Sequence, residues 1–192
     1  MISDNHKNFH MKQSLREKIL KKRNSLTQDD KSNLDSIIYD KIYAFLSNQK
    51  SKIIGLYYSI GSEVETHTLI NILLDEGFKI ALPSINEYDT LTFIEISSTD
   101  DLYQGKFCLE PHISIEHTVI PEIIMLPLVA FDKHGNRIGY GKGYYDKTLV
   151  NFENAKKVGI AYAFQEIDYQ NIYCNDVKLE CIITDQQIIY TS

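Results

Sequence analysis

Short apolar segments alternate along this chain with longer segments of helical periodicity, and this alternation constrains the fold most. The apolar segments have the length and β-branched composition of strands and occupy residues 52–58, 78–82, 91–96, 122–128, 157–161, 181–184 and 187–191. Helical patterns occupy residues 11–47, 65–76 and 144–152. Strands that alternate with helices usually pair in parallel. The sequence therefore predicts a single α/β domain over residues 1–192, with a largely parallel, Rossmann-like sheet flanked by helices.

The first part of the chain is predicted to form a pair of helices. Residues 1–10 are polar and are expected to be disordered. An apolar stripe of Leu15, Ile19 and Leu26 follows. The basic side chains around it are Lys12, Arg16, Lys18, Lys21, Lys22 and Arg23. They could form a solvated helix face or serve an anionic ligand. Thr27 with an acid three residues later is typical of a helix start, so a second helix is expected there.

Residues 131–149, FDKHGNRIGYGKGYYDKTL, contain the densest group of candidate ligand-binding residues. Three glycines alternate in this segment, at Gly139, Gly141 and Gly143. Glycine lets the backbone turn and approach a ligand closely, and turned backbone N–H groups at a helix start bind anions. Arg137 and Lys142 supply the positive charge that a polyphosphate needs, and Asp146 offers oxygen ligands for a cation. The segment predicts a nucleotide-phosphate loop that opens a helix.

This loop matches neither of the two common phosphate-binding patterns. A Walker A motif places Ser or Thr beside its lysine, whereas Tyr144 lies near Lys142 here. A dinucleotide fingerprint has the spacing G-x-G-x-x-G, whereas this loop has G-x-G-x-G. A glycine cluster between strand and helix can also be only a tight connection. The basic, aromatic and acidic residues at the same positions favour the ligand-binding interpretation.

Three segments follow predicted strands and could meet in one cleft, because ligands of parallel sheets lie beyond the carboxyl ends of strands. These segments are residues 59–65, 83–87 and 131–146, and Pro83 is expected to end the second strand. In the first of them, Glu63 and Glu65 could cap the next helix or bind N–H groups of a ligand. Near the end of the chain, Asp176 could join Asp146 on a metal ion or could only form a turn.

Composition argues against several other classes of protein. The sequence is 43% hydrophobic and 24% charged and shows neither a membrane-spanning apolar run nor a secretory signal. Its formal net charge of −6 argues against nucleic-acid binding. The cysteine count of 3 is odd and lacks a C-x-x-C pair, so we expect free thiols and a cytoplasmic location. The 6 histidines show no metal-ligand spacing.

Taken together, these segments resemble the 5-formyltetrahydrofolate cyclo-ligase family, also called 5,10-methenyltetrahydrofolate synthetases. LPLVAFDKHGNRIGYGKGYYDKTL, residues 126–149, is similar to the signature of that family. The basic opening KQSLREKILKKRNSL, the acidic segment SEVET and the segment LPSI also resemble it. GKFCLEP from Gly105 and NDVKLECIITD from Asn175 resemble its later segments, so the resemblance covers nearly the whole chain.

The resemblance implies a reaction and its cofactor. The family converts 5-formyltetrahydrofolate and ATP into 5,10-methenyltetrahydrofolate, ADP and phosphate, using magnesium. The γ-phosphate activates the formyl oxygen, N10 of the folate attacks the activated carbon, and phosphate leaves. Such a reaction needs positioning and charge neutralisation more than a protein nucleophile. We therefore expect folate and ATP as small-molecule partners, Mg²⁺ as cofactor, and a monomer or a weak dimer.

The resemblance also implies roles for individual residues. ATP contacts are implied for Lys12, Gln13, Ser14, Leu15, Arg16, Arg137, Ile138, Gly139, Tyr140, Gly141, Lys142, Gly143, Tyr144 and Tyr145. Folate contacts are implied for Arg16, Tyr58, Glu63, Tyr140, Gly141, Lys142, Gly143 and Tyr144. Lys142 and Arg137 are expected to act in catalysis, and Asp146 and Asp176 to bind magnesium.

The chain departs from the family pattern at Ser84, where a basic residue is common, and at Asn175 and Glu180, where His and Asp are usual. These departures motivate an alternative, a non-catalytic regulator that binds folate and nucleotide on the same scaffold. An unrelated sugar-phosphate enzyme on a similar sheet is a third possibility, because one fold can host many functions. The pairing of the glycine loop with the basic first helix argues against that third possibility.

Overall fold

A seven-stranded sheet forms the centre of the computed structural model, which describes residues 4–49, 52–100, 102–106, 108–168 and 177–191. The strands, in sheet order, are β11 (Ile188–Tyr190), β10 (Cys181–Ile183), β9 (Lys156–Ile160), β6 (Ile123–Pro127), β1 (Ile53–Gly55), β2 (Lys79–Ile85) and β3 (Leu91–Ile96). Neighbouring strands from β10 to β2 pair in parallel, and the outer strands β3 and β11 pair antiparallel. The predicted α/β fold with a largely parallel sheet is confirmed.

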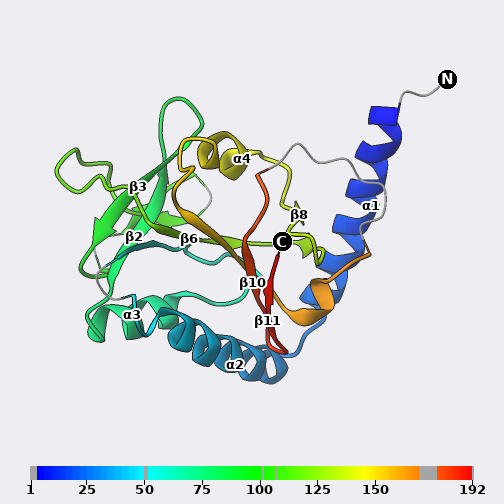
Figure 1. Ribbon diagram of the computed structural model, residues 1–192, viewed down its shortest axis with the longest axis horizontal. Coiled ribbons are helices and arrows are strands. Elements are labelled where there is room, and N and C mark those ends of the chain that lie inside the picture. Colours follow the sequence, from blue (N-terminus) through cyan, green and yellow to red (C-terminus); the bar gives the residue numbers. More distant parts are fainter. Residues whose placement is uncertain (1–3, 50–51, 101, 107, 169–176, 192) are drawn as a thin grey trace.

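Helices cover both faces of this sheet (Figure 1). On one face lie α2 (Gln28–Leu46) and α3 (His67–Asp75), and on the other lies α4 (Tyr144–Leu149). Ile38 and Leu73, from α2 and α3, are fully buried in one apolar cluster with side chains of the sheet, and Leu149 of α4 belongs to a second cluster. Burying these apolar stripes supplies most of the stability of such a layered domain.

Helix α1 (Asp4–Asn24) lies at one side of the sheet, with its first turns projecting beyond it (Figure 1). Leu15 and Ile19 pack against Ile138 in a small apolar cluster. The expectation that residues 1–10 are disordered is wrong for residues 4–10, which belong to α1, while residues 1–3 lie outside the described part of the chain. Residues 4–10 contain neither Gly nor Pro, so nothing in them ends the helix.

Helix α2 begins as predicted. Thr27 is its N-cap, and the threonine hydroxyl accepts a hydrogen bond from the backbone N–H of Asp30 at 3.1 Å.

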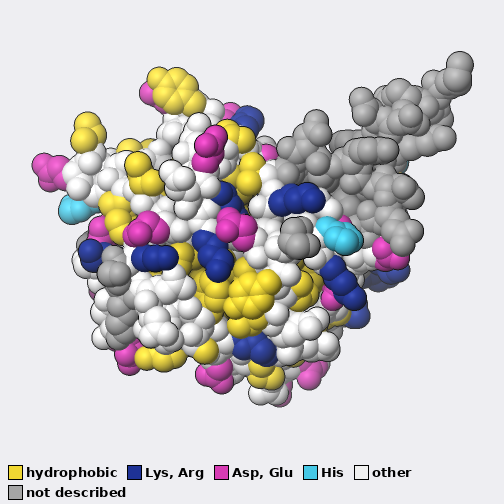
Figure 2. Space-filling model, viewed as in Figure 1, with side chains coloured by type: hydrophobic (Ala, Val, Ile, Leu, Met, Phe, Trp, Pro, Cys, Tyr) yellow, Lys and Arg dark blue, Asp and Glu magenta, His cyan; other side chains and the backbone are white. Residues whose placement is uncertain are grey.

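Within the described residues, no helix is long and apolar enough to cross a membrane. Figure 2 shows basic and acidic side chains interspersed around a central group of hydrophobic ones on the face viewed in Figure 1. The charge of this face is therefore mixed in sign.

Pro83 does not end β2, contrary to expectation. The strand continues to Ile85, and Pro83 pairs with Phe93 of the antiparallel neighbour β3. The carbonyl of Phe93 accepts a hydrogen bond from Val119, on the side away from β2, so the Pro83–Phe93 pair exchanges no backbone hydrogen bonds. On its other side, β2 pairs with β1 only as far as Ala81. Proline therefore occupies a position where the sheet requires no N–H group.

Candidate active site

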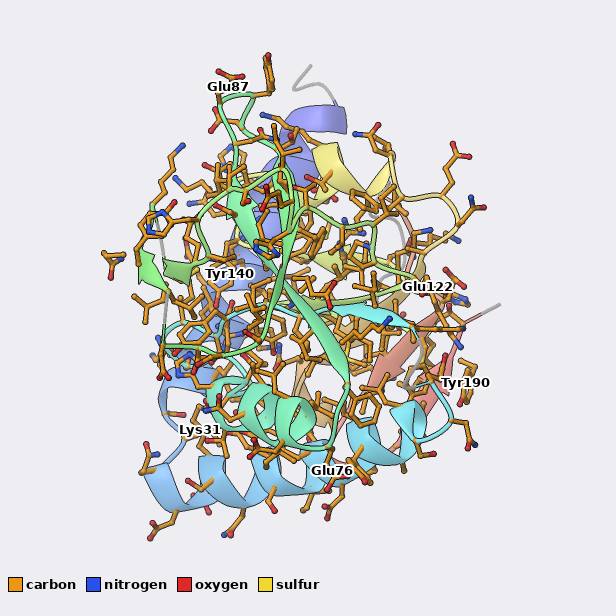
Figure 3. The ribbon with its side chains drawn as sticks, turned by 90° about the vertical axis from the view of Figure 1, so that its left-hand side faces the viewer. Lys31, Glu76, Glu87, Glu122, Tyr140 and Tyr190 are labelled. Carbon is orange, nitrogen blue, oxygen red and sulfur yellow. The ribbon has the colours of Figure 1, made fainter. Side chains whose placement is uncertain are left out.

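A cavity of about 460 Å³ lies beyond the carboxyl ends of the parallel strands. From β1 the chain passes to β2 on one side, whereas β6, β9 and β10 add on the other, so the order of the strands reverses between β1 and β6. Figure 3 shows Tyr140, which lines the cavity, on the opposite side of the molecule from Glu122, which precedes β6. The cavity thus occupies the switch point where α/β proteins bind ligands.

All three segments that were predicted to converge line this cavity. Ile60 and Glu63 follow β1, Pro83 and Ile85 come from the end of β2, and residues 137–146 form the longest part of the wall. These segments are far apart in the sequence and meet because parallel strands end at the same edge of the sheet. The predicted single cleft is confirmed.

The glycine loop links β8 (Arg137–Ile138) to α4, and two of its glycines adopt left-handed backbone angles. Gly141 has a φ of 90°, and Gly143, the N-cap of α4, has a φ of 74°. Residues with a Cβ atom adopt this region only at a cost, so glycine is required at both positions. Gly139 does not have a left-handed φ and has open space at the position of a Cβ atom. A residue with a side chain would therefore fit at position 139 without a clash.

Helix α1 forms the wall that faces the glycine loop. Lys12 and Arg16 line the cavity, and Nε of Arg16 donates a hydrogen bond to the carbonyl of Gly139 at 2.8 Å. The helix therefore holds the loop directly, across a gap of more than a hundred residues in the sequence.

The other three α1 residues with an implied role in ATP binding lie outside the cavity lining. Gln13 and Ser14 are exposed, and Gln13 donates a hydrogen bond to Glu17 at 3.1 Å. Leu15 packs in the apolar cluster with Ile19. Successive helical residues point in different directions, so only one stripe of α1 can face a single ligand. Contacts of these three residues with ATP stay a prediction.

The two acids of the SEVET segment serve different ends. Glu65 caps α3, because its carboxylate accepts hydrogen bonds from the backbone N–H groups of His67 and Thr68. Glu63 is only 4% exposed, lines the cavity and accepts a hydrogen bond from the N–H of Ile60 at 2.8 Å. Glu65 thus takes the capping role left open by the sequence, while Glu63 lines the cavity and its contact with a ligand stays a prediction.

Burial raises the pKa of the Glu63 carboxyl above its ordinary value. The hydrogen bond from Ile60, the positive charge of Arg23 and a hydrogen bond from the Tyr140 hydroxyl act in the opposite direction. A buried carboxyl with a shifted pKa beside a cavity is typical of a binding or catalytic site.

Arg137 is buried and binds two partners near the N-terminal end of α4. Its guanidinium forms an ion pair with Asp146 and donates a hydrogen bond to the carbonyl of Val177. Asp146 itself is 44% exposed at the side chain and lines the cavity. Lys142 is exposed and also lines the cavity. Arg137 therefore ties the closing segment of the chain to the carboxylate that was predicted to bind metal.

Of the two aspartates predicted to bind magnesium, the structure describes only Asp146. Asp176 lies outside the described residues, so its distance from Asp146 is not defined. The part of the chain that is described holds no group of three or more side chains that could ligate a metal. Carboxylate oxygen is nevertheless the ligand that magnesium prefers, and one or two carboxylates with substrate phosphates are its usual protein environment. Asp146 fits that chemistry.

Sequence reasoning missed the buried carboxylate of Glu110, which lines the cavity and is 3% exposed. It accepts hydrogen bonds from the Ser84 hydroxyl at 2.9 Å, from the N–H of Ile85 at 2.9 Å and from the N–H of Lys106 at 2.8 Å. A Cβ atom at Gly105 would lie 1.9 Å from this side chain, so glycine is required for the close approach. The signal was present in GKFCLEP, where glycine, a lone acid and proline occur together.

Ser84 and Cys108 now have structural explanations. The Ser84 hydroxyl is used by Glu110, so the residue that replaces a basic side chain of the family is part of a buried hydrogen-bond network. Burial, with the charges of Glu110 and Glu63, raises the pKa of the Cys108 thiol to about 11. The thiol is therefore protonated at neutral pH and is a poor nucleophile, in keeping with the absence of a predicted cysteine mechanism.

Tyrosines form much of the remaining cavity surface. The tyrosines that line it are Tyr57, Tyr58, Tyr140, Tyr144 and Tyr145. Burial, followed by the charge of Glu63, raises the pKa of Tyr140 to about 12, so its hydroxyl stays protonated and able to donate. Aromatic side chains beside the buried carboxylate of Glu63 suit a flat heterocycle that has both π-faces and N–H groups.

Comparisons with known proteins agree with this geometry. Residues 8–185 match the 5-formyltetrahydrofolate cyclo-ligase family. The 5-formyltetrahydrofolate cyclo-ligase of Mycoplasma pneumoniae is 34% identical over 179 residues, which cover 91% of this chain and 99% of that protein. The one from Haemophilus influenzae is 31% identical over 170 residues, or 84% of this chain and 90% of that protein.

A solved structure of similar fold is the 5,10-methenyltetrahydrofolate synthetase of Aquifex aeolicus, with a TM-score of 0.82 and 29% identity over 94% of this chain and 92% of that one. The 5,10-methenyltetrahydrofolate synthetase of Mycoplasma pneumoniae aligns with a TM-score of 0.72 at 31% identity, over 91% of this chain and 98% of that one. The fold, the lining of the cavity and these similarities lead to one conclusion: the chain belongs to the 5-formyltetrahydrofolate cyclo-ligase family.

Proposed function

We propose that the protein uses ATP to convert 5-formyltetrahydrofolate into 5,10-methenyltetrahydrofolate, with release of ADP and phosphate. The observation that carries this proposal is the composition of one cavity. Lys12 and Arg16 from α1, Glu63 after β1 and the glycine loop with Lys142 all line it. A cation-rich wall and a tyrosine-rich wall with a buried acid thus face the same space, as a reaction between ATP and a pterin requires.

The proposed chemistry begins with the formyl group, a poor electrophile. Its oxygen attacks the γ-phosphorus of ATP, the bond to the β,γ-bridging oxygen breaks, and ADP leaves. The lone pair of N10 then attacks the activated carbon and closes the five-membered ring. The C–O bond breaks, phosphate departs with the former formyl oxygen, and the N10 proton is released. Neither step forms a bond to the protein, so positioning and charge stabilisation suffice.

The side chains of the cavity supply both requirements. Lys142 and Lys12 would neutralise charge on the transferred phosphoryl group, and the N–H groups of the glycine loop would hold phosphate oxygens. Arg137 would act by holding Asp146 in place, since its guanidinium already binds that carboxylate. Glu63 would accept hydrogen bonds from N–H groups of the pterin while the tyrosines pack on its rings.

We also propose that Asp146 and Asp176 hold Mg²⁺ when ATP is bound. Magnesium supplies positive charge and fixes the geometry of the β- and γ-phosphates in phosphoryl transfer. The ion pair with Arg137 positions the Asp146 carboxylate at the edge of the cavity, and carboxylate oxygen is a ligand that magnesium prefers.

Two further expectations concern the setting of the enzyme. The described thiols, Cys108 and Cys181, form no disulfide, which is compatible with a reducing cytoplasm. We propose that the protein works there as a monomer or a weak dimer. Light scattering over a range of protein concentrations tests the second point.

The function is tested by following the near-ultraviolet absorbance of the methenyl product with purified protein, 5-formyltetrahydrofolate, ATP and magnesium. We expect product only when all three small molecules are present, with one phosphate released per product. A protein that binds folate and ATP in equilibrium dialysis but releases no phosphate at saturating ATP would be the regulator considered above. That outcome would contradict the proposed reaction.

A further inference from the structure

Arg23, near the end of α1, is a buried cation next to the cavity. It is 3% exposed, and its guanidinium bonds to three separate parts of the chain. Nε donates to the Ser62 hydroxyl at 3.0 Å, Nη1 donates to the carbonyl of Leu128 at 3.1 Å, and Nη2 donates to the Tyr140 hydroxyl. In the sequence, Arg23 is one of several basic residues around the apolar stripe of α1. Helical periodicity alone does not show that this one is buried.

Through Tyr140, Arg23 reaches the acid of the cavity. The Tyr140 hydroxyl accepts a hydrogen bond from Arg23, and both Tyr140 and Glu63 line the cavity, where their interaction lowers the pKa of the Glu63 carboxyl. Ser62, the second partner of Arg23, is the residue directly before Glu63. One guanidinium therefore holds both the side chain of the residue directly before Glu63 and the hydroxyl that acts on the Glu63 carboxyl.

Two of the groups that Arg23 contacts have a second hydrogen-bond partner, so they would not be left unpaired without Arg23. The carbonyl of Leu128 also accepts from Nε2 of Gln165 at 2.6 Å, and the Ser62 hydroxyl also bonds to Asn24. Burying a guanidinium is costly, and an apolar side chain of similar size often stabilises a fold as well or better. A buried arginine whose partners have other bonds is therefore better explained by the geometry that it imposes on the site.

We propose that Arg23 is a positioning residue of the folate site, which acts through Tyr140 and Ser62 to hold Glu63 toward the ligand. The proposal rests on the proposed function, because it takes folate as the ligand of Glu63. Arg23 itself does not line the cavity, so it acts on folate only through these neighbours.

The test compares Arg23→Met, Arg23→Lys and Tyr140→Phe with the wild type, measuring the Kd of 5-formyltetrahydrofolate and the KM values of folate and ATP. We expect Arg23→Met to weaken folate binding by about 10- to 100-fold, the range for losing a hydrogen bond to a charged group, with a smaller effect on the KM of ATP. Arg23→Lys keeps the charge and should recover part of the affinity. Lys22→Met is the matched control, since exposed Lys22 lies over the ring of Phe164 outside the cavity lining.

A double-mutant cycle and a pH profile separate positioning from simple loss of structure. In a Tyr140→Phe background, Arg23→Met should cost less than it does in the wild type, because the route through Tyr140 is already removed while the contact with Ser62 and the charge of Arg23 remain. Removing the charge of Arg23 destabilises the Glu63 carboxylate, so the acid limb of folate affinity should move to higher pH in Arg23→Met and not in Arg23→Lys. The other groups that act on or respond to Glu63 are Lys31, Tyr57, Cys108, Tyr140 and Tyr145.

The outcomes are distinguishable. If the wild type binds folate without turnover, the proposed reaction fails, and Arg23 is still judged on Kd and its pH dependence. If the wild type does not bind folate, both proposals fail. Unchanged folate affinity in a folded Arg23→Met protein would overturn the positioning role. Should that variant not fold, an unaltered Kd and acid limb in Tyr140→Phe would overturn it instead.

Discussion

At the residue scale, Lys142 carries the positive charge of the glycine loop toward the cavity. It is exposed, so its removal should leave the melting temperature unchanged while it weakens the use of ATP. We expect Lys142→Ala to lower kcat/KM for ATP by about 10- to 100-fold, the usual range for a charged hydrogen bond. Lys147→Ala, which removes an exposed charge of α4 outside the cavity lining, is the control. Equal ATP kinetics in both variants would contradict the role of Lys142.

Also at the residue scale, the buried carboxyl of Glu63 should lower the stability of the fold while it contributes to folate binding. Burial raises its pKa above the ordinary 4.5, so the folded protein holds this proton to higher pH than the unfolded chain does. Stability therefore falls as pH rises from the ordinary pKa to the raised one, and the cost persists above it. Glu63→Gln should raise the melting temperature near neutral pH, by roughly 2–4 °C for each kcal/mol relieved, and abolish tight folate binding.

Thermal unfolding of both proteins across the acidic range checks the sign of this effect. The gain should shrink toward the ordinary pKa of Glu63, where its carboxyl is protonated in the folded and unfolded states alike. A gain that is independent of pH would show that the ionisation of Glu63 is not its cause.

At the element scale, the glycine loop depends on backbone angles that a pair of substitutions can separate. Gly141 has a left-handed φ and a Cβ atom there would lie 3.4 Å from the Arg16 guanidinium, whereas Gly139 has neither constraint. We expect Gly141→Ala to lower the free energy of unfolding by about 1–2 kcal/mol. Gly139→Ala should change it by less than about 0.5 kcal/mol. Urea unfolding measures both, and equal losses would contradict the argument from φ.

The elements themselves were largely predictable, because hydrophobic periodicity and caps are local signals. The start of α2 at Thr27 and all seven strands of the main sheet agree with the sequence, with bounds that differ by a few residues. The exceptions depend on tertiary context. Pro83 stays within β2 because β1 has ended beside it, which no local pattern reveals. The helical state of residues 4–10 was missed because polarity alone was taken as a sign of disorder.

At the scale of the whole molecule, the site was predictable where a motif is continuous and not where contacts cross the chain. The glycine loop and the SEVET acid were found because glycine spacing and charge are visible in a short stretch. Arg23 and Glu110 were missed because their importance lies in burial, and burial of a charged side chain depends on partners as distant as Tyr140 and Ser84. Periodicity assigns such side chains to the surface, where charged residues usually lie.

The same long-range assembly predicts how ligands should stabilise the whole protein. A ligand that binds only the folded state at about 100 times its Kd adds about 2.7 kcal/mol of stability. For a chain of this length, that corresponds to a rise in melting temperature of about 5–10 °C. ATP with magnesium should produce this rise, and ATP with a chelator should produce much less of it, if a carboxylate-bound ion holds the phosphates.

Asp146→Asn makes this prediction specific to one carboxylate. The variant keeps an oxygen that can accept from Arg137 but loses the charge that balances this buried guanidinium, so its melting temperature without ligand should fall, and the ligand shift is measured from that lower value. It should lose the part of the ATP shift that depends on magnesium and keep the part seen with a chelator. Asp40→Asn, a change of the same chemistry on the exposed side of α2, should keep both parts. Asp146 is the one carboxylate within α4, the helix that follows the glycine loop. A full magnesium-dependent shift in Asp146→Asn would therefore mean that the ion is held elsewhere.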